Sequence, residues 1–117
     1  MRDTLYLLAP DIFDRGRREY CPECAEMWGV LSYYPFLRET VEIVYEPIAH
    51  PRPGIVAALG EGEWNCPTLV LADDAPTYDA APEARANGKR YFKSARAIGR
   101  YFAHRYGTAF PRGFEHP

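Results

Sequence analysis

The stretch REYCPECAEMWGV, residues 18 to 30, places two cysteines with two residues between them at the start of a predicted helix. From Cys21 to Tyr34 apolar and aromatic side chains recur at helical spacing. Pro22 occupies the first turn, where proline is tolerated, and Pro35 ends the run. A pair with this spacing can be a redox couple, half of a metal site, or two thiols that are merely close.

Length and composition limit the number of domains and the kinds of partner. The chain has 117 residues, 47% of them hydrophobic, which suffices for one core. We therefore expect a single domain over residues 1–117, with an irregular tail from about residue 108. A formal net charge of -2 provides no electrostatic footprint for nucleic acid, and no apolar run approaches the roughly 18 to 20 residues that cross a bilayer. We expect neither nucleic acid nor a membrane as partner.

The compartment follows from the N-terminus and the cysteine count. The opening MRDTLYLLAPD has too short an apolar run for a signal peptide, so we expect a cytoplasmic protein. In a reducing cytoplasm three cysteines do not form a structural disulfide framework, and a close pair is more often catalytic, redox-sensing or metal-binding.

Hydrophobic periodicity predicts four strands and three helices in the order β-α-β-α-β-β-α. The predicted strands are residues 4–8, 41–48, 67–74 and 88–93, and the predicted helices are residues 21–34, 55–59 and 94–107. A strand, a helix and a strand in succession imply a parallel crossover, and the last two strands imply a hairpin in the same sheet. The sequence thus predicts an α/β fold with a mixed four-stranded sheet flanked by helices. Residues 10–20 and 73–88 are predicted to be irregular.

Three motifs together resemble the thioredoxin fold. YCPEC, residues 20–24, is similar to the active-site motif of glutaredoxins, in which a tyrosine comes directly before Cys-Pro-x-Cys. NCPTLVLADD, residues 65–74, resembles the segment that carries a cis-proline before a strand in glutaredoxins and in the N-terminal domain of glutathione transferases. FKSARAIGRYFAHRYG, residues 92–107, resembles the end of that transferase domain. The whole chain also resembles a bacterial family of small thioredoxin-like proteins of unknown function, through MRDTL, the CxxC, PRP and LVLADDAP.

This resemblance implies a thiol–disulfide oxidoreductase that acts on a protein or small-molecule thiol or disulfide. Cys21 is the expected nucleophile, because a thiol at a helix N-terminus faces unpaired N–H groups that favour its thiolate. Cys24 is the expected resolving thiol, since it lies one turn further along and can attack a mixed disulfide on Cys21. The substrate-binding residues that the resemblance implies are Tyr20, Pro22, Asn65, Cys66, Pro67 and Ser94.

Glutathione is the small thiol that the resemblance suggests as a partner or cofactor. In the transferases an acidic residue followed by serine holds the γ-glutamyl end of glutathione at the start of the last helix. Here the matching pair is Lys93 and Ser94. Ser94 fits this role, whereas Lys93 removes the partner for the ammonium group of the ligand.

A second interpretation of the cysteines stays open. Cys66 precedes Pro67, and if this bond is cis, the three sulfurs converge and could bind zinc or an iron–sulfur cluster. A closed tetrahedral site needs a fourth ligand, for which His50 and His104 are candidates. The alternative function is therefore a thioredoxin-like binding module that holds a metal through Cys21, Cys24 and Cys66, or docks a partner protein, without turnover.

Overall fold

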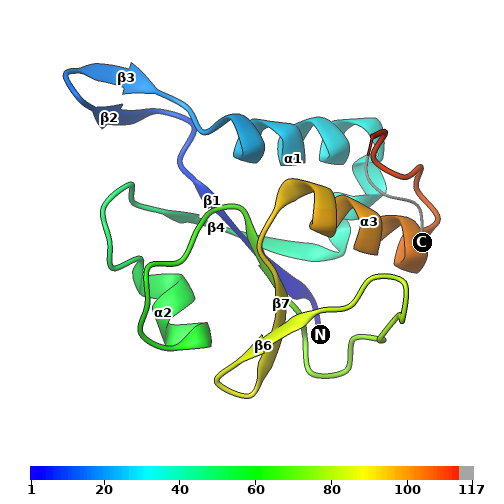
Figure 1. Cartoon of the computed structure of the whole chain (residues 1–117). Helices are drawn as coiled ribbons and strands as arrows, with labels where there is room; N and C mark the ends of the chain where they lie inside the picture. The colour runs from blue at the N-terminus through cyan, green and yellow to red at the C-terminus, as the bar shows by residue number, and fades with distance from the viewer. Residues whose placement is uncertain (114–117) are drawn as a thin grey trace.

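Five strands form one mixed sheet in the spatial order β4-β1-β5-β7-β6 (Figure 1). The strands are β1, Asp3–Leu8; β4, Val41–Glu46; β5, Thr68–Val70; β6, Ala84–Ala86; and β7, Lys89–Phe92. β4 runs parallel to β1, whereas β5 runs antiparallel to both β1 and β7. The computed structural model describes residues 1–113; the last part of the predicted irregular tail, residues 114–117, lies outside the described residues.

Helices cover both faces of this sheet. Helices α1, Pro22–Tyr33, and α3, Ala95–Tyr106, pack against each other on one face, and the short helix α2, Pro53–Leu59, lies on the other (Figure 1). A 3-10 helix, Pro35–Glu39, follows α1 and leads into β4. Among residues 1–113, no helix combines the length and the hydrophobicity that a membrane span requires.

The predicted α/β class and mixed sheet are confirmed. The parallel pairing of β1 with β4 is the predicted crossover around α1, and the antiparallel pairing of β5 with β7 is the predicted hairpin. The last helix begins and ends as predicted, because Ser94 is its N-cap and Gly107 its C-cap, with a φ of 76°. Residues 108–113 contain neither helix nor strand.

Two predictions about strands were wrong. The sheet has five strands, because residues 73–88, which were predicted to be irregular, contain β6, and β6 pairs with β7. Residues 10–20 hold a separate two-stranded hairpin, β2, Ile12–Asp14, and β3, Arg17–Glu19. Each of these strands has only three residues and lies at an edge, so none carries the alternation that periodicity can detect.

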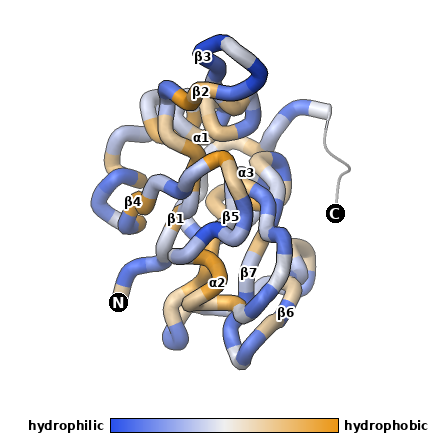
Figure 2. Tube along the Cα trace, turned by 90° about the vertical axis from the view of Figure 1, so that its left-hand side faces the viewer, coloured by the Kyte–Doolittle hydropathy of each residue, from blue (hydrophilic) through white to orange (hydrophobic). Residues whose placement is uncertain are grey.

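The core of the protein lies between the sheet and the pair formed by α1 and α3. Its fully buried side chains come mainly from β1 and both helices, and include Leu5, Leu7, Met27, Leu31, Ile98 and Phe102. Figure 2 shows that the hairpin, by contrast, projects from one end of the molecule and is largely hydrophilic in β3. The hairpin is attached to the start of α1, and Ile12 of β2 is its buried contact with the core.

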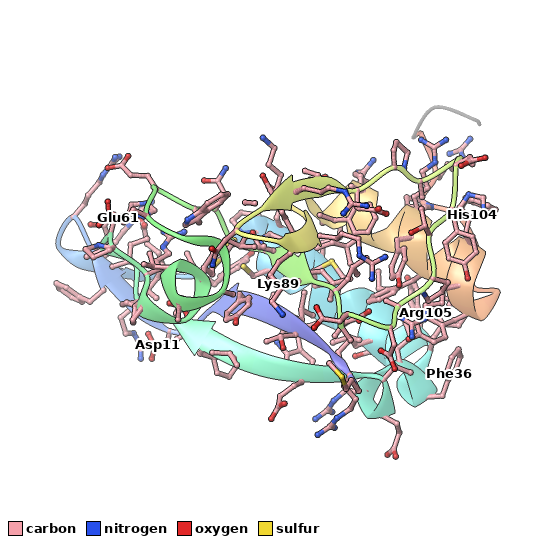
Figure 3. The ribbon with its side chains drawn as sticks, turned by 90° about the horizontal axis from the view of Figure 1, so that it is seen from below. Asp11, Phe36, Glu61, Lys89, His104 and Arg105 are labelled. Atoms are coloured by element: carbon pink, nitrogen blue, oxygen red, sulfur yellow. The ribbon has the colours of Figure 1, made fainter. Side chains whose placement is uncertain are left out.

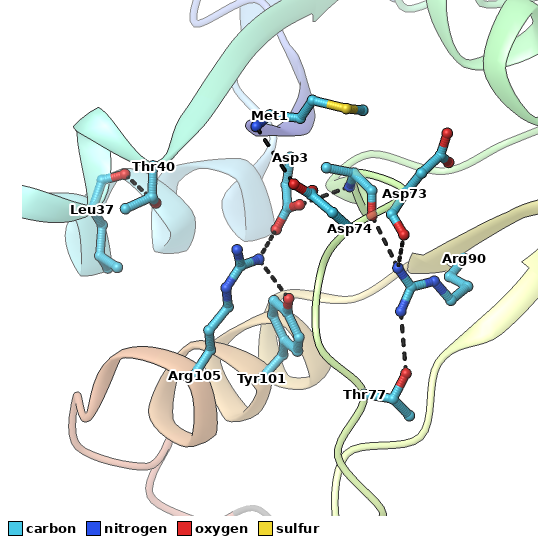
Figure 4. Close-up of polar contacts among 11 residues, drawn as sticks. Met1, Asp3, Leu37, Thr40, Asp73, Asp74, Thr77, Arg90, Tyr101 and Arg105 are labelled. Atoms are coloured by element: carbon cyan, nitrogen blue, oxygen red, sulfur yellow. Dashed lines mark hydrogen bonds and ion pairs between the residues drawn. The ribbon is translucent and has the colours of Figure 1, made fainter.

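A buried ion pair closes the end of the sheet where β1 begins. The Asp3 carboxylate is 1% exposed; it accepts hydrogen bonds from the Ala72 N–H at 2.8 Å and from Arg105 Nη1 at 2.9 Å (Figure 4). Arg105 Nη1 also donates to the Tyr101 hydroxyl at 2.7 Å. Burial raises the pKa of Asp3 above its ordinary value of 3.8, although the Ala72 N–H and Arg105 oppose this shift.

Candidate functional site around the cysteine pair

Cys21 is the N-cap residue of α1. Its extended backbone, with φ -80° and ψ 116°, starts the helix, and its Sγ accepts a hydrogen bond from the Cys24 N–H at 3.2 Å. Pro22 occupies the first turn of the helix. The sulfur is half-buried, and the donated N–H and the helix dipole both favour a negative charge on it. The sequence-based placement of Cys21 at the helix N-terminus is confirmed.

Cys24 lies behind Cys21, against the end of β1. Its side chain is 4% exposed, and its Sγ accepts a hydrogen bond from the Leu8 N–H at 3.4 Å. Burial raises the pKa of the Cys24 thiol, and the neighbouring Cys21 raises it further. All three cysteines are free thiols in this structure.

Cys66 lies next to Cys21 and contacts it through the Cys66 backbone. The Cys66–Pro67 peptide bond is cis, and the carbonyl oxygen of Cys66 lies 3.8 Å from Cys21 Sγ. Burial raises the pKa of the Cys66 thiol to about 11, although the positive charge of Arg52 opposes this shift. Cys66 therefore remains protonated at neutral pH. Asn65 is exposed, and its backbone carbonyl oxygen accepts a 2.6 Å hydrogen bond from Thr68 Oγ1.

Arg52 is a structural residue of this region that the sequence analysis missed. It is 6% exposed, and its guanidinium donates to three carbonyl oxygens, those of Pro47 at 3.1 Å, Ile48 at 3.0 Å and Trp64 at 2.9 Å. These bonds hold the segment that leads into the cis-proline. An arginine between two prolines is the only local signal, and a buried arginine is rare without such partners.

The start of α3 is occupied by groups of the protein itself. Ser94 Oγ accepts a hydrogen bond from the Ala97 N–H at 3.1 Å, and Glu23, from the CPEC motif, accepts one from the Ala95 N–H at 3.1 Å. The Glu23 carboxylate is thus directed toward α3. Ser94 has a capping role, and its part in binding a substrate stays a prediction. With a carboxylate of the chain already bound there, this helix end is poorly suited to the γ-glutamyl carboxylate of glutathione.

A small cavity of about 260 Å³ opens beside the cysteine pair. Its lining comes from the last residue of β1 and the two that follow it, the two residues before α1, and the first two turns of α1: Leu8, Ala9, Pro10, Tyr20, Cys21, Cys24, Ala25 and Trp28. Of the predicted substrate-binding residues, only Tyr20 lines this cavity, together with the two cysteines. Ala25 and Trp28 carried no functional signal in the sequence, because helical apolar residues usually belong to the core.

The predicted alternative ligands for a metal lie elsewhere. His104, on α3, packs between the rings of Tyr78 and Phe110, with ring-centre distances of 5.8 and 5.1 Å. His50 lines a separate hollow with Glu61 and Glu63, on the side of α2. Among residues 1–113 no group of three or more Cys, His, Asp or Glu side chains is arranged to hold a metal ion.

Comparison with known proteins gives one family. The sequence profile described as "Protein of unknown function (DUF3088)" matches residues 2–110, which is nearly the whole chain. Neither the curated proteins nor the solved structures contain a match.

Proposed function

We propose that this chain, which belongs to the family of proteins of unknown function DUF3088, is a thioredoxin-like thiol–disulfide oxidoreductase that acts in the cytoplasm through Cys21 and Cys24. One observation carries the proposal: Cys21 Sγ is the N-cap group of α1 and accepts the Cys24 N–H at 3.2 Å. This arrangement favours a thiolate on Cys21 and leaves the second thiol one helical turn away.

The reaction proceeds in two exchange steps. The Cys21 thiolate attacks one sulfur of a substrate disulfide; a Cys21–substrate bond forms, the substrate S–S bond breaks, and the other sulfur leaves as a thiolate that takes up a proton. Cys24 then loses its proton and attacks Cys21 Sγ, which releases the second substrate thiol. The protein is oxidised to the Cys21–Cys24 disulfide, and the substrate disulfide is reduced to two thiols.

The raised pKa of Cys24 suits its place in the second step. Cys21 raises this pKa in two ways, by its hydrogen bond with the Cys24 side chain and by like-charge repulsion. Both contributions weaken once Cys21 Sγ carries the substrate sulfur, because the negative charge on Cys21 is then gone. Burial, the largest cause of the raised pKa of Cys24, remains, but the thiol is easier to deprotonate in the mixed disulfide than beside a Cys21 thiolate.

The competing proposal is a binding module that holds a metal through Cys21, Cys24 and Cys66. It has less support, because no cluster among residues 1–113 is arranged for a metal and Cys66 approaches Cys21 through its carbonyl oxygen. Metal analysis of the purified protein, before and after Cys66→Ser, tests this alternative. Stoichiometric zinc or iron that is lost with Cys66 would favour the binding module.

The test of the exchange reaction uses reduced protein and bis(2-hydroxyethyl) disulfide. We expect the wild type to release mercaptoethanol, Cys21→Ser to be inactive, and Cys24→Ser to stop at a mixed disulfide that mass spectrometry detects on Cys21. Cys66→Ser is the comparison variant, because it keeps the backbone that faces Cys21 and removes only the buried Cys66 thiol, whose raised pKa disfavours a thiolate. Exchange by Cys21→Ser at the wild-type rate would refute the proposal.

A further inference from the structure

The cavity beside Cys21 is small and almost entirely apolar in its lining. Its volume of about 260 Å³ lies below the roughly 300–1,000 Å³ of sites for drug-sized ligands. Leu8, Pro10 and Trp28 supply apolar walls, and Ala25 is an exposed residue at the rim. Burial of an apolar group in such a site is favourable, whereas burial of a charged group is costly. The cavity therefore suits a single apolar side chain.

The β2–β3 hairpin presents a free strand edge next to this cavity. Arg15 and Gly16 form its turn, with φ values of 53° and 81°, as in a type I′ turn. Among the described residues, the small sheet formed by the hairpin contains only β2 and β3. The outer edge of β3 therefore has no strand partner. Asp14 and Arg17 pair beside the two-residue turn, and the alternation of antiparallel pairs then directs the backbone N–H and C=O of Arg18 away from β2.

The free edge of β3 leads directly to the reactive cysteine. β3 ends at Glu19, and Tyr20 connects it to Cys21, so Arg18 and Cys21 are three residues, or roughly 10 Å of extended chain, apart. Figure 1 shows the hairpin beside the start of α1 and beyond the main body. The Tyr20 side chain is 66% exposed at the rim of the cavity. An extended chain paired with β3 can thus reach both the cavity and the Cys21 sulfur.

The charges of the hairpin are balanced within it. Each arginine lies near one carboxylate: Arg15 with Asp14 at 3.8 Å, Arg17 with Glu19 at 2.8 Å, and Arg18 with Asp11 at 3.6 Å. These pairs are exposed and individually weak, but together they leave no net charge near the cavity to select an anionic thiol. The surroundings of Cys21 favour a substrate with little charge next to its cysteine.

We infer that the hairpin and the cavity bind an extended polypeptide segment, which pairs with the edge of β3 and places an apolar side chain beside its reacting cysteine into the cavity. This inference rests on the proposed exchange reaction and specifies its substrate class. Strand addition supplies affinity through backbone hydrogen bonds, and the cavity supplies selectivity. Cys21 attacks the disulfide sulfur of the bound segment, and the subsequent steps are those of the proposed reaction.

The first part of the test measures selectivity for the side chain. Reduced protein is mixed with disulfide-linked dimers of two short peptides that differ only in carrying leucine or aspartate next to cysteine, and release of peptide thiol is followed. We expect the leucine peptide to react at least about tenfold faster, which corresponds to burial of one apolar side chain. Ala25→Leu fills the cavity and lowers this ratio toward one. Ser32→Leu, exposed on the same helix and outside the cavity, is the control that leaves the ratio unchanged.

The second part measures the strand pairing. Arg18→Pro removes the outward N–H of β3, whereas Arg18→Ala removes the same side chain and keeps the N–H. We expect the proline variant to react with the leucine peptide about fivefold more slowly than the alanine variant, which corresponds to one lost hydrogen bond. Circular dichroism and thermal unfolding show whether both variants are folded to the same extent. Where the proline variant is unfolded, N-methylation of the leucine peptide at successive residues provides the same comparison from the other partner.

The outcomes separate this inference from the proposed function. Equal rates for the two peptides would overturn the inference while exchange with bis(2-hydroxyethyl) disulfide continues to support the proposed function. A preference for leucine with no difference between the two Arg18 variants, or among the N-methylated peptides, would also overturn it, because the cavity would then accept an apolar thiol without a paired strand. No exchange with any disulfide would refute both.

Discussion

The polar groups at the two ends of β1 differ: one end carries a buried ion pair, and the other a hydrogen bond to a thiol sulfur. At its start, Asp3 is fully buried and its carboxylate is paired with Arg105. At its end, the Leu8 N–H donates a 3.4 Å hydrogen bond to Cys24 Sγ, next to a cavity. Figure 3 shows Asp11, just beyond the end of β1, and Arg105, which binds Asp3, toward opposite sides of the molecule.

The difference separates an end of β1 that is held by a buried ion pair from an end whose thiols belong to no ion pair. The Asp3 end has strong, charge-assisted hydrogen bonds among groups withdrawn from water, and loss of either partner leaves a buried charge. The cysteine end has only weak hydrogen bonds to sulfur, so its thiols can change their bonds without loss of a buried ion pair. Substitutions at the two ends are therefore expected to affect different properties.

The largest expected effect is on stability, at the Asp3 end. Arg105→Met leaves the Asp3 carboxylate buried without its cation, so the free energy of unfolding should fall by about 3 kcal/mol at neutral pH. Burial already raises the pKa of Asp3 in the folded protein, so the folded state binds this proton more tightly than the unfolded chain does. The contribution of Asp3 to stability is therefore greatest below its ordinary pKa of 3.8 and decreases as the pH rises through the folded-state pKa.

Urea unfolding of Arg105→Met at several pH values checks this prediction, and the deficit relative to wild type should shrink as the pH falls. Arg96→Met is the matched control, because Arg96 pairs with Glu26 at 3.0 Å where both side chains are exposed to solvent. We expect it to cost less than about 1 kcal/mol. Equal losses for the two variants would contradict the role assigned to the buried pair.

The next effect separates the cysteines by alkylation. The pKa of Cys66 is raised from 9.0 to about 11, so its thiolate fraction near pH 8 is about a hundredfold lower than that of an ordinary thiol. Iodoacetamide labelling followed by peptide mass spectrometry should modify Cys21 first and Cys66 slowly in the folded protein. Unfolding in urea is the control, since it should make the labelling rates alike. Rapid labelling of Cys66 in the folded protein would be incompatible with its burial.

A smaller effect concerns the start of α3. Ser94→Ala removes the N-cap hydrogen bond to the Ala97 N–H and should lower the free energy of unfolding by about 1 kcal/mol. Exchange with bis(2-hydroxyethyl) disulfide should continue at the wild-type rate if Ser94 acts only as a cap. Ser94→Thr keeps the capping oxygen and serves as the control. A slower exchange in Ser94→Ala, restored by threonine, would instead support a role in substrate binding.

The smallest expected effect is on the stability of the Cys21→Ser variant. Cys21→Ser should change the free energy of unfolding by no more than about 0.5 kcal/mol, because a serine hydroxyl accepts the Cys24 N–H at an N-cap at least as well as sulfur does. Exchange should nevertheless be lost. Chemical denaturation and the exchange assay on the same preparation check this pair of results. A large loss of stability would mean that the Cys21 sulfur is needed to hold the fold together.

Local patterns predicted the elements that bury a long apolar face. β1, α1 and α3 each combine a periodic core with a clear boundary, such as Pro22 at the start of α1 or Gly107 after α3. The same patterns missed β2, β3 and β6, which are short and polar or lie at an edge. Their pairing depends on turn geometry and on neighbouring strands, and the periodicity of apolar residues indicates neither of these.

The sequence by itself determined the α/β class, because the order of the predicted strands and helices is read along the chain. It also determined the start of α1 at the CxxC and the caps of α3, because these depend on residues within one or two turns of one another. Only the tertiary structure decided what surrounds the thiols. Arg52 reaches three carbonyl oxygens, Glu23 caps a helix that lies 72 residues away in sequence, and the ends of separate elements enclose the cavity at Cys21. Such contacts join segments that are distant along the chain, and they form only when the sheet and its helices pack together.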